Sequence, residues 1–244
     1  MERNIIPQIK ICGITDIRET EYLNEYSVDY AGFVFYSPSR RHVTIDQAEQ
    51  IAKELDTKIK KVAVLVSPDA EQIEAIQEAG FADILQIHKD IDIRALRAAD
   101  LPVWRAVNIS SMHNLDAAAS LNDTDADLLT AGLTDTEADM LTAGIADTEA
   151  DLLTAKITAI VVDAPDFGSG KTFDWGTGQI KIKSNLKFIL AGGLNASNVA
   201  EGIRIFGPNI VDVSSGVEGD HGKSREKIAG FVKAVREFKH QEEQ

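Results

Sequence analysis

Three residues that could exchange protons with a substrate come at the ends of short apolar runs. Cys12 ends the first of these runs, His88 ends a later one, and Asp163 stands near the end of another. A thiol and a carboxyl group can act as base and acid, and a histidine can relay or stabilise a proton. The three residues lie far apart in the chain, so only the fold can bring them to one site.

Two further apolar runs end in small residues that suit an anion. One ends in Gly192 and Gly193, and the next ends in Ser214, Ser215 and Gly216. The backbone N–H groups of such turns, helped by a short helix N-terminus, can hold a phosphate group. Each pattern alone is weak, but the two on consecutive strands are fairly specific. They predict a phosphorylated substrate.

The elements that must position these residues are short runs rich in β-branched residues. Continuous apolar runs, as opposed to alternating ones, are typical of parallel strands that are buried on both faces. Eight such runs are present, at residues 9–12, 30–36, 61–67, 82–88, 103–109, 157–164, 187–193 and 210–215.

Segments with helical spacing and start signals lie between most of these runs. Asp69 predicts the start of one helix and Gly80 its end. Asn195 predicts the start of another, with Gly207 as its stop. Residues 224–239 predict a last helix with a single apolar stripe.

Eight strands alternating with helices predict an α/β chain folded as a (β/α)8 barrel, or TIM barrel, with residues 1–244 forming a single domain. An open, doubly wound sheet is the alternative. It would require a glycine-rich turn after the first strand, where only Gly13 is present, so there is no dinucleotide-binding fingerprint. In a barrel the active site lies at the C-terminal ends of the strands, where Cys12, His88 and Asp163 are expected.

Residues 123–158 repeat one phrase three times with a period of 12 residues. We interpret this acidic repeat as an insertion between a predicted fifth helix (112–121) and the sixth strand. Its first unit resembles the beginning of a calcium loop. However, Leu128 and Thr134 stand where that loop requires glycine and glutamate, so no metal site is predicted.

The composition restricts the possible partners and the compartment. The net charge of −14 argues against nucleic acid or an anionic membrane as a partner, although residues 123–158 alone carry nine acids and one lysine. A single cysteine excludes an internal disulfide and fits a reducing compartment. The chain starts without a secretory apolar run and has no apolar stretch of membrane-spanning length. We therefore expect a cytoplasmic protein that is a monomer or a homodimer.

Six segments of the chain carry a resemblance to a known family. They are KICGIT at 10–15, GFVFYSPSRR at 32–41, LQIH at 85–88, VVDAPDFGSGKTFDW at 161–175, LAGGLNASNV at 190–199 and VDVSSGVE at 211–218. In this order they resemble phosphoribosylanthranilate isomerase, an enzyme of tryptophan biosynthesis. The resemblance covers nearly the whole chain except the repeat. Lys89 and Phe167 stand where the family usually has glycine.

The resemblance implies a role for each site residue. Cys12 would be the general base, Asp163 the general acid, and Arg41 the group that holds the anthranilate carboxylate. Independently of the resemblance, the position of His88 at a strand end indicates a supporting residue that lines the substrate site, in preference to a catalytic one. The small residues after the last two strands would bind the phosphate of the substrate: Gly192, Gly193, Ser214, Ser215 and Gly216. The reaction requires no metal and no organic cofactor.

The implied chemistry makes demands on two pKa values. A cysteine is a base only as the thiolate, so we expect the site to lower the pKa of Cys12 from about 8.5. A general acid must stay protonated, so we expect the pKa of Asp163 to be raised.

Other interpretations of the same residues exist. Cys12 taken alone could be a small buried apolar residue, and Asp163 could cap a helix. The whole chain could be a catalytically inactive barrel with the acidic repeat as a docking element. It could also be the sister aminoaldose isomerase of histidine biosynthesis or an enzyme acting on both substrates, but those enzymes have an aspartate where Cys12 stands.

Overall fold

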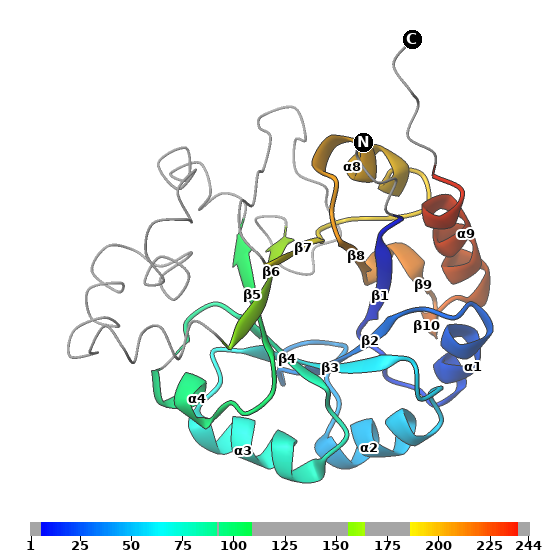
Figure 1. The fold of residues 1–244 in the computed structure, drawn as a ribbon. Helices are drawn as coiled ribbons and strands as arrows, with labels where there is room; N and C mark the ends of the chain where they lie inside the picture. Colours follow the sequence, from blue (N-terminus) through cyan, green and yellow to red (C-terminus); the bar gives the residue numbers. More distant parts are fainter. Residues whose placement is uncertain (1–5, 92, 109–155, 164–185, 239–244) are drawn as a thin grey trace.

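The computed structural model describes residues 6–91, 93–108, 156–163 and 186–238 (Figure 1). The predicted fifth helix (112–121), nearly all of the repeat and the substituted residue Phe167 lie outside the described residues.

Eight parallel strands close into a barrel in the order of the sequence. The last strand pairs with the first through four residue pairs, which excludes an open sheet and confirms the predicted barrel. The strands are β1 (Gln8–Cys12), β2 (Tyr30–Phe35), β3 (Lys60–Val66), β4 (Ile84–His88), β5 (Val103–Asn108), β6 (Ile157–Asp163), β7 (Lys187–Leu190) and β8 (Ile210–Val213).

The described helices surround the barrel on its outside, as Figure 1 shows. They are α1 (Arg18–Glu25), α2 (Ile45–Lys53), α3 (Ala70–Ala79), α4 (Ile93–Ala98), α8 (Val199–Phe206) and α9 (Arg225–Arg236). Between β8 and α9 the chain forms the 3₁₀ turn η4 (Ser215–Val217) and a small hairpin of β9 (Glu218–Gly219) and β10 (Gly222–Lys223). This connection follows a strand end and therefore lies on the face of the barrel where the site is expected.

Three of the predicted helix boundaries, at Asp69, Gly80 and Ser224, are confirmed. The side chain of Asp69 accepts a hydrogen bond from the backbone N–H of Gln72, and Gly80 ends α3 in the left-handed conformation. Ser224 caps α9 in the same way as Asp69 caps α3. The apolar stripe of α9 is buried, through Ile228, Phe231, Val232 and Val235.

The predicted start of α8 at Asn195 is wrong. The carboxamide oxygen of Asn195 accepts hydrogen bonds from the backbone N–H and the hydroxyl of Ser197, which holds a turn in place of a helical start. The helix begins at Val199. It ends before Gly207, which caps it in the left-handed conformation, so the predicted end is confirmed.

Side chains of each strand alternate between the interior of the barrel and the helices outside it, which creates two apolar cores. The larger core lies between barrel and helices. The smaller fills the barrel, where the rings of Tyr30 and Trp104 meet edge to face with centroids 5.0 Å apart. Its other members include Val62, Val64, Ile84, Ala106, Ala159, Val161, Ile189, Ala191 and Ile210, and Cys12 packs against them.

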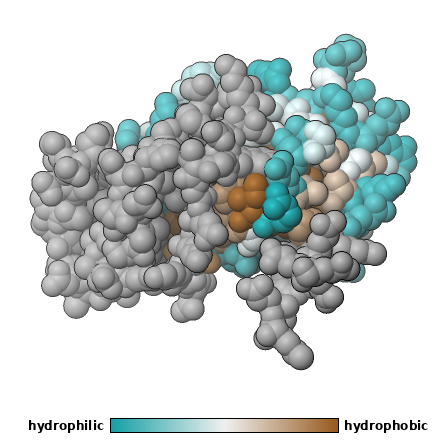
Figure 2. All heavy atoms as spheres, turned by 90° about the horizontal axis from the view of Figure 1, so that it is seen from above, coloured by the Kyte–Doolittle hydropathy of each residue, from teal (hydrophilic) through white to brown (hydrophobic). Residues whose placement is uncertain are grey.

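The described surface visible in Figure 2 is mostly hydrophilic. None of the helices in the described part of the chain is long and apolar enough to cross a membrane.

Two opposite charges lie inside the barrel beside this core. Lys10 of β1 and Asp212 of β8 are paired positions of neighbouring strands, and Lys10 Nζ donates to Asp212 Oδ2 at 2.7 Å. The side chains are 0% and 7% exposed. Burial would lower the pKa of Lys10, but the charge of Asp212 and the thiol of Cys12 raise it above its ordinary value, so the ammonium form persists.

We predict that Asp212→Ala lowers the free energy of unfolding by about 3–5 kcal/mol, because it leaves the Lys10 charge buried without a partner. The double variant Lys10→Met/Asp212→Leu should recover most of this loss. Urea denaturation followed by circular dichroism measures both. As a control, Lys60→Met breaks the more exposed ion pair with Asp83 and should cost at most about 1 kcal/mol. A loss for Asp212→Ala no larger than that of the control would contradict the prediction.

Candidate active site

Cys12 ends β1. One neighbouring glycine, Gly32, makes room for its sulfur, and another, Gly13, makes room for the side chain of Arg41. An added Cβ at Gly32, the neighbour of Cys12 on β2, would lie 2.9 Å from the Cys12 sulfur. An added Cβ at Gly13 would lie 2.4 Å from Cδ of Arg41, and Gly13 also has a positive φ of 79°. Only glycine is compatible with both conditions at position 13. The stem of Arg41 therefore passes directly over the residue that follows Cys12.

Arg41 comes from the loop after β2, and its guanidinium meets Glu218 of β9. Its Nε donates to Glu218 Oε1 at 2.6 Å and its Nη2 donates to Oε2 at 3.1 Å, a two-pronged contact. The Arg41 side chain is only 12% exposed. Arg40 also pairs with Glu218, but its side chain is 72% exposed. The structure thus places Arg41, and not Arg40, inside the site.

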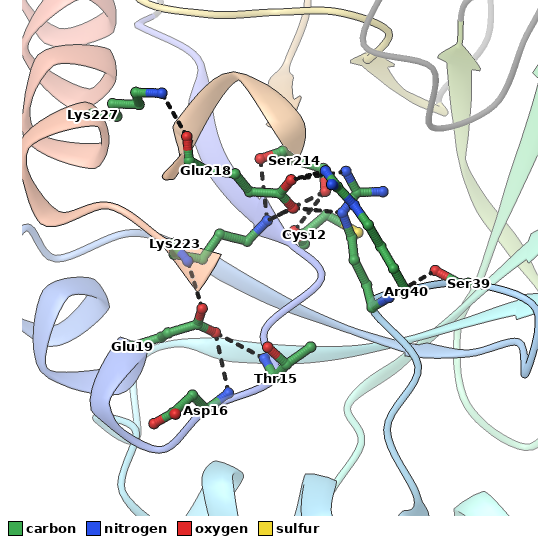
Figure 3. Close-up of polar contacts among 11 residues, drawn as sticks. Cys12, Thr15, Asp16, Glu19, Ser39, Arg40, Ser214, Glu218, Lys223 and Lys227 are labelled. Atoms are coloured by element: carbon green, nitrogen blue, oxygen red, sulfur yellow. Dashed lines mark hydrogen bonds and ion pairs between the residues drawn. The ribbon is translucent and has the colours of Figure 1, made fainter. Parts of the chain in front are cut away.

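Lys223 of β10 approaches Glu218 from the other side. Its Nζ donates to Glu218 Oε1 at 3.0 Å and to the carbonyl oxygen of Ser214 at 3.1 Å. The hydroxyl of Ser214 in turn donates to the carbonyl oxygen of Cys12 at 2.9 Å. Figure 3 shows Glu218 and Lys223 pointing toward each other, with Ser214 and Cys12 beside them. A continuous polar network therefore runs from the Arg41 guanidinium to the backbone of the Cys12 residue.

Glu19 of α1 anchors this network to the rest of the barrel. Its Oε2 accepts hydrogen bonds from the N–H groups of Thr15 and Asp16, at 2.8 and 3.3 Å, and its Oε1 accepts one from the N–H of Lys223 at 2.6 Å. Glu19 is buried. The loop after β1 and the hairpin after β8 are thereby held together by one carboxylate (Figure 3).

The small residues that were predicted to bind phosphate come from two loops in contact. An added Cβ at Gly216 would lie 1.9 Å from the carbonyl oxygen of Leu194, so the turn η4 packs directly on the loop after β7. Gly192 and Gly193 both have positive φ, 85° and 66°. Ser214 and Ser215 begin and form η4. The predicted phosphate residues are therefore brought to one place.

His88 ends β4 and is buried. The amide nitrogen of Gln86 lies 2.8 Å from its Nε2. Burial, with the charges of Lys10 and Arg105, lowers the pKa of His88 to about 3, so the imidazole is neutral at any ordinary pH. This agrees with a supporting role and excludes an imidazolium acid at this position in the free protein.

Asp163 is the last residue of β6 and is partly buried. It follows Ala159 and Val161 at a spacing of two residues along the strand, and these two residues belong to the core inside the barrel. Its side chain therefore belongs to the inner face at the C-terminal end of the strand, as does that of Cys12. Two strands, β7 and β8, separate it from β1. Among the described residues, no group of three or more His, Cys, Asp or Glu side chains could hold a metal ion.

The expectation that the site lowers the pKa of Cys12 is wrong for the free protein. Burial raises the pKa of the thiol, and the charges of Lys10 and Lys223 reverse this only in part. Asp212 raises it further, because its negative charge offsets that of Lys10. The thiol is therefore the dominant form near neutral pH.

The sequence reasoning did not assign a role to Lys10, Glu19, Asp212, Glu218 or Lys223. A signal existed for two of them. Lys10 and Asp212 are charged residues within apolar strands, each two positions before a predicted site residue, and this spacing indicates the inner face. Glu218 and Lys223 follow β8 in an irregular connection, where no periodicity marks them.

Lys89, one of the departures from the family pattern, has a positive φ of 57°. This is the backbone conformation that favours glycine and explains why a glycine suits the position. The lysine occupies the left-handed conformation and is exposed.

Comparisons with known proteins agree on one family. A family model described as N-(5'phosphoribosyl)anthranilate (PRA) isomerase matches residues 9–138 and 140–234, a range that includes the repeated segment. A protein of Streptococcus gordonii named N-(5'-phosphoribosyl)anthranilate isomerase is 37% identical over 233 residues, covering 94% of this chain and 98% of the relative. A protein of the same name from Clostridium acetobutylicum is 33% identical over 238 residues, covering 95% and 99%.

Solved structures give the same result. Phosphoribosyl anthranilate isomerase from Thermotoga maritima superposes with a TM-score of 0.70 at 29% identity, covering 94% of this chain and 98% of the other. A phosphoribosyl anthranilate isomerase solved in complex with reduced 1-(o-carboxyphenylamino)-1-deoxyribulose 5-phosphate superposes with a TM-score of 0.65 at 26% identity, with the same coverage.

We predict that the native thiol of Cys12 titrates at a higher pH than the same thiol in urea-unfolded protein, because burial disfavours the thiolate. Cys12 is the only cysteine of the chain, so thiolate absorbance in the ultraviolet reports this residue once the signal of a Cys12→Ser variant is subtracted. Lys223→Met should move the midpoint further upward, because it removes a positive charge that favours the thiolate. A native midpoint at or below that of the unfolded chain would contradict the assignment.

Proposed function

The chain belongs to the N-(5'-phosphoribosyl)anthranilate isomerase family, and on this premise we propose how its residues divide the reaction. We infer that it converts N-(5'-phosphoribosyl)anthranilate to 1-(2-carboxyphenylamino)-1-deoxyribulose 5-phosphate in tryptophan biosynthesis. This Amadori rearrangement turns an aminoaldose into an aminoketose. It moves protons and transfers no group to or from another molecule.

Asp163 is the general acid and Cys12 the general base. Asp163 donates its proton to the ring oxygen of the ribose, so that the ring opens to an iminium ion. The Cys12 thiolate then removes the proton from C2′, which leaves an enolamine that tautomerises to the ketone. Both groups must face the same sugar, and residues at the inner ends of β1 and β6 can do so across the barrel mouth.

The raised pKa of the Cys12 thiol affects this scheme in two opposite ways. Only a minority of free molecules carries the thiolate near neutral pH. The thiolate that does form is a stronger base than an ordinary one, because basicity rises with the pKa of the conjugate acid. The fraction of molecules that carry the Cys12 thiolate therefore increases as the pH rises toward the raised pKa.

Arg41 binds the carboxylate of the anthranilate ring. The observation that carries this proposal is the contact of its stem with Gly13, which seats a guanidinium beside the proposed base. A planar guanidinium can hold a carboxylate through two parallel hydrogen bonds. The substrate is then oriented with its ribose carbon toward Cys12.

The phosphate of the substrate is bound at the packed turns after β7 and β8, and His88, at the end of β4, lines the site on the opposite side of the barrel. The contact between Gly216 and Leu194 supports this assignment, because it joins the two loops into one surface. The structure of a relative with a bound phosphorylated product analogue supports the same class of substrate.

We further propose that the chain acts in the cytoplasm as one domain, in monomeric or homodimeric form. The single cysteine supports a reducing compartment. A solved relative from Thermotoga maritima is described as monomers generated from a dimeric enzyme, which supports either state. The acidic repeat is proposed to be an insertion in this domain.

We predict that Cys12→Ser and Asp163→Asn each lower kcat by at least about a hundredfold, the usual scale of general acid–base catalysis. A hydroxyl does not ionise near neutral pH, and an amide cannot donate the required proton. The loss of fluorescence of freshly generated phosphoribosylanthranilate measures the activity. Each variant should still bind the reduced product analogue. Near-full turnover by Cys12→Ser would refute the role of the thiol.

We predict that Arg41→Ala weakens productive substrate binding by about 1.5–3 kcal/mol, the scale of a hydrogen bond between charged groups. Arg40→Ala serves as the matched control and should have much less effect, because the Arg40 side chain is 72% exposed. The ratio kcat/KM of both variants in the same fluorescence assay decides between them. Greater sensitivity of the Arg40 variant would reverse the assignment within this pair.

A further inference from the structure

Glu218 is the centre of the charged groups in the candidate site, yet the reaction scheme gives it no part. Its two oxygens accept hydrogen bonds from Arg40, Arg41 and Lys223, and its side chain is only 13% exposed. Burial alone would raise the pKa of Glu218, but the hydrogen bond from Arg41 and the charge of Lys223 lower it to about 2. The group is therefore a permanent carboxylate at any pH at which the enzyme works.

The contact with Glu218 uses one particular edge of the Arg41 guanidinium. A guanidinium has five N–H bonds, one on Nε and two on each terminal nitrogen. Glu218 takes the Nε–H and one N–H of Nη2. The edge formed by Nη1 and the other N–H of Nη2 is left for a second carboxylate, with the same fork geometry. Arg41 can thus bind Glu218 and a substrate carboxylate at the same time.

Two other contacts restrict Arg41 to this orientation. Its stem lies against Gly13, where an added Cβ would overlap it at 2.4 Å. Its backbone N–H donates to the hydroxyl of Ser39 at 3.1 Å. The stem and the backbone are therefore held, and the remaining freedom is rotation of the guanidinium. A bidentate partner with a fixed position removes that freedom.

Glu218 itself is held by groups on both sides of its side chain. Lys223 is anchored to Ser214, and Lys227 donates to the backbone carbonyl oxygen of Glu218 at 2.6 Å (Figure 3). The hairpin that carries Glu218 is tied to α1 and to the loop after β1 through Glu19. The position of the carboxylate is thus set by the barrel scaffold and not by the loop that carries Arg41.

We propose that Glu218 is a positioning residue that holds the Arg41 guanidinium with its outer edge toward the carboxylate of the substrate. The inference rests on the carboxylate-binding role proposed above for Arg41. Glu218 does not touch the reacting atoms and acts through Arg41. Without it, Arg41 would retain its charge but would lose its fixed direction.

The test compares two ligands that differ only in the carboxylate. One is reduced 1-(o-carboxyphenylamino)-1-deoxyribulose 5-phosphate, and the other is the reduced phenylamino compound that lacks the carboxyl group. Calorimetric titration gives both dissociation constants for the full-length enzyme, for Glu218→Gln, for Arg41→Ala and for the double variant. The ratio of the two constants reports recognition of the carboxylate and cancels effects on phosphate binding, which both ligands share.

We expect Glu218→Gln to reduce the preference for the carboxylate ligand by about 10- to 100-fold, the range for a lost hydrogen bond between charged groups. Arg41→Ala should reduce it by a similar factor. The double variant should lose no more than Arg41→Ala alone, because Glu218 acts only through Arg41. A matched control is Glu201→Gln, an exposed carboxylate that lies 3.8 Å from Arg204, which should leave the preference unchanged.

Three outcomes would overturn one of the two assignments. If Arg41→Ala loses the preference and a folded Glu218→Gln variant keeps it within about twofold, the positioning role is refuted and the role of Arg41 stands. If both variants keep the preference, the proposed carboxylate site at Arg41 is itself refuted. If the losses in the double variant add up, Glu218 acts by a separate route and the inference fails.

A second variant covers the case in which Glu218→Gln does not fold. Removing Glu218 leaves Lys223 buried beside it without its counter-charge, and the Lys223 side chain is only 1% exposed. The double variant Glu218→Gln/Lys223→Met removes that charge as well. It should show the same loss of preference for the carboxylate ligand, because Arg41 is equally unsupported in it. A full preference in this variant would refute the proposal.

Discussion

A charge inside a protein must meet an opposite charge, and in this barrel that requirement shapes the site. Lys10 and Asp212 satisfy each other in the interior, at paired positions of β1 and β8. Their pairing has a consequence for the thiol two residues further along β1. Burial raises the pKa of Cys12, and the Lys10 ammonium lowers it. The negative charge of Asp212 counteracts the ammonium, so the pKa remains above its ordinary value. The carboxylate that lets the barrel bury a lysine therefore also adds to the effect of burial on the pKa of the proposed base.

Charges also pair at the rim of the barrel, but there the positive charges outnumber the negative ones. Three cations, Arg40, Arg41 and Lys223, meet the single carboxylate of Glu218, so this cluster has an excess of positive charge. The substrate of this family is anionic at both ends, with a carboxylate and a phosphate. The net charge of −14 does not oppose its binding, because charges more than about 8–10 Å away are screened by salt, whereas Arg41 is proposed to contact the substrate carboxylate directly.

Much of the fold and part of the site could be predicted from the sequence, for a physical reason. Strands of a parallel barrel are buried on both faces, so each of the eight appears as a continuous apolar run. The chemically reactive residue at the end of a run then marks the end of the strand, where the active site of a barrel lies. Cys12, His88 and Asp163 were found in this way. The start of α8 was predicted three residues too early, because Asn195 and Asn198 are both suitable caps and only the local turn selects between them. The pKa of Cys12 was predicted in the wrong direction, because the burial of the thiol outweighs the nearby charge of Lys10, and the opposing charge of Asp212 comes from the far end of the chain.

Glu218 ends one of the six family-like segments, but neither its contacts nor those of Lys223 could be predicted from the spacing of residues. Their connection has no helical or strand period, so the spacing of residues carries no information on which side chains point inward. Contacts between the connections that follow the neighbouring strands β8, β1 and β2 determine their positions: Glu19 of α1 holds the N–H of Lys223, and Arg41 of the loop after β2 meets Glu218. Each of these contacts joins segments that are more than 170 residues apart. The closure of the barrel, which places β8 beside β1, is what brings a carboxylate from the end of the chain to an arginine near its beginning. The chemistry of the loop after β2 therefore depends on the last strand being in place.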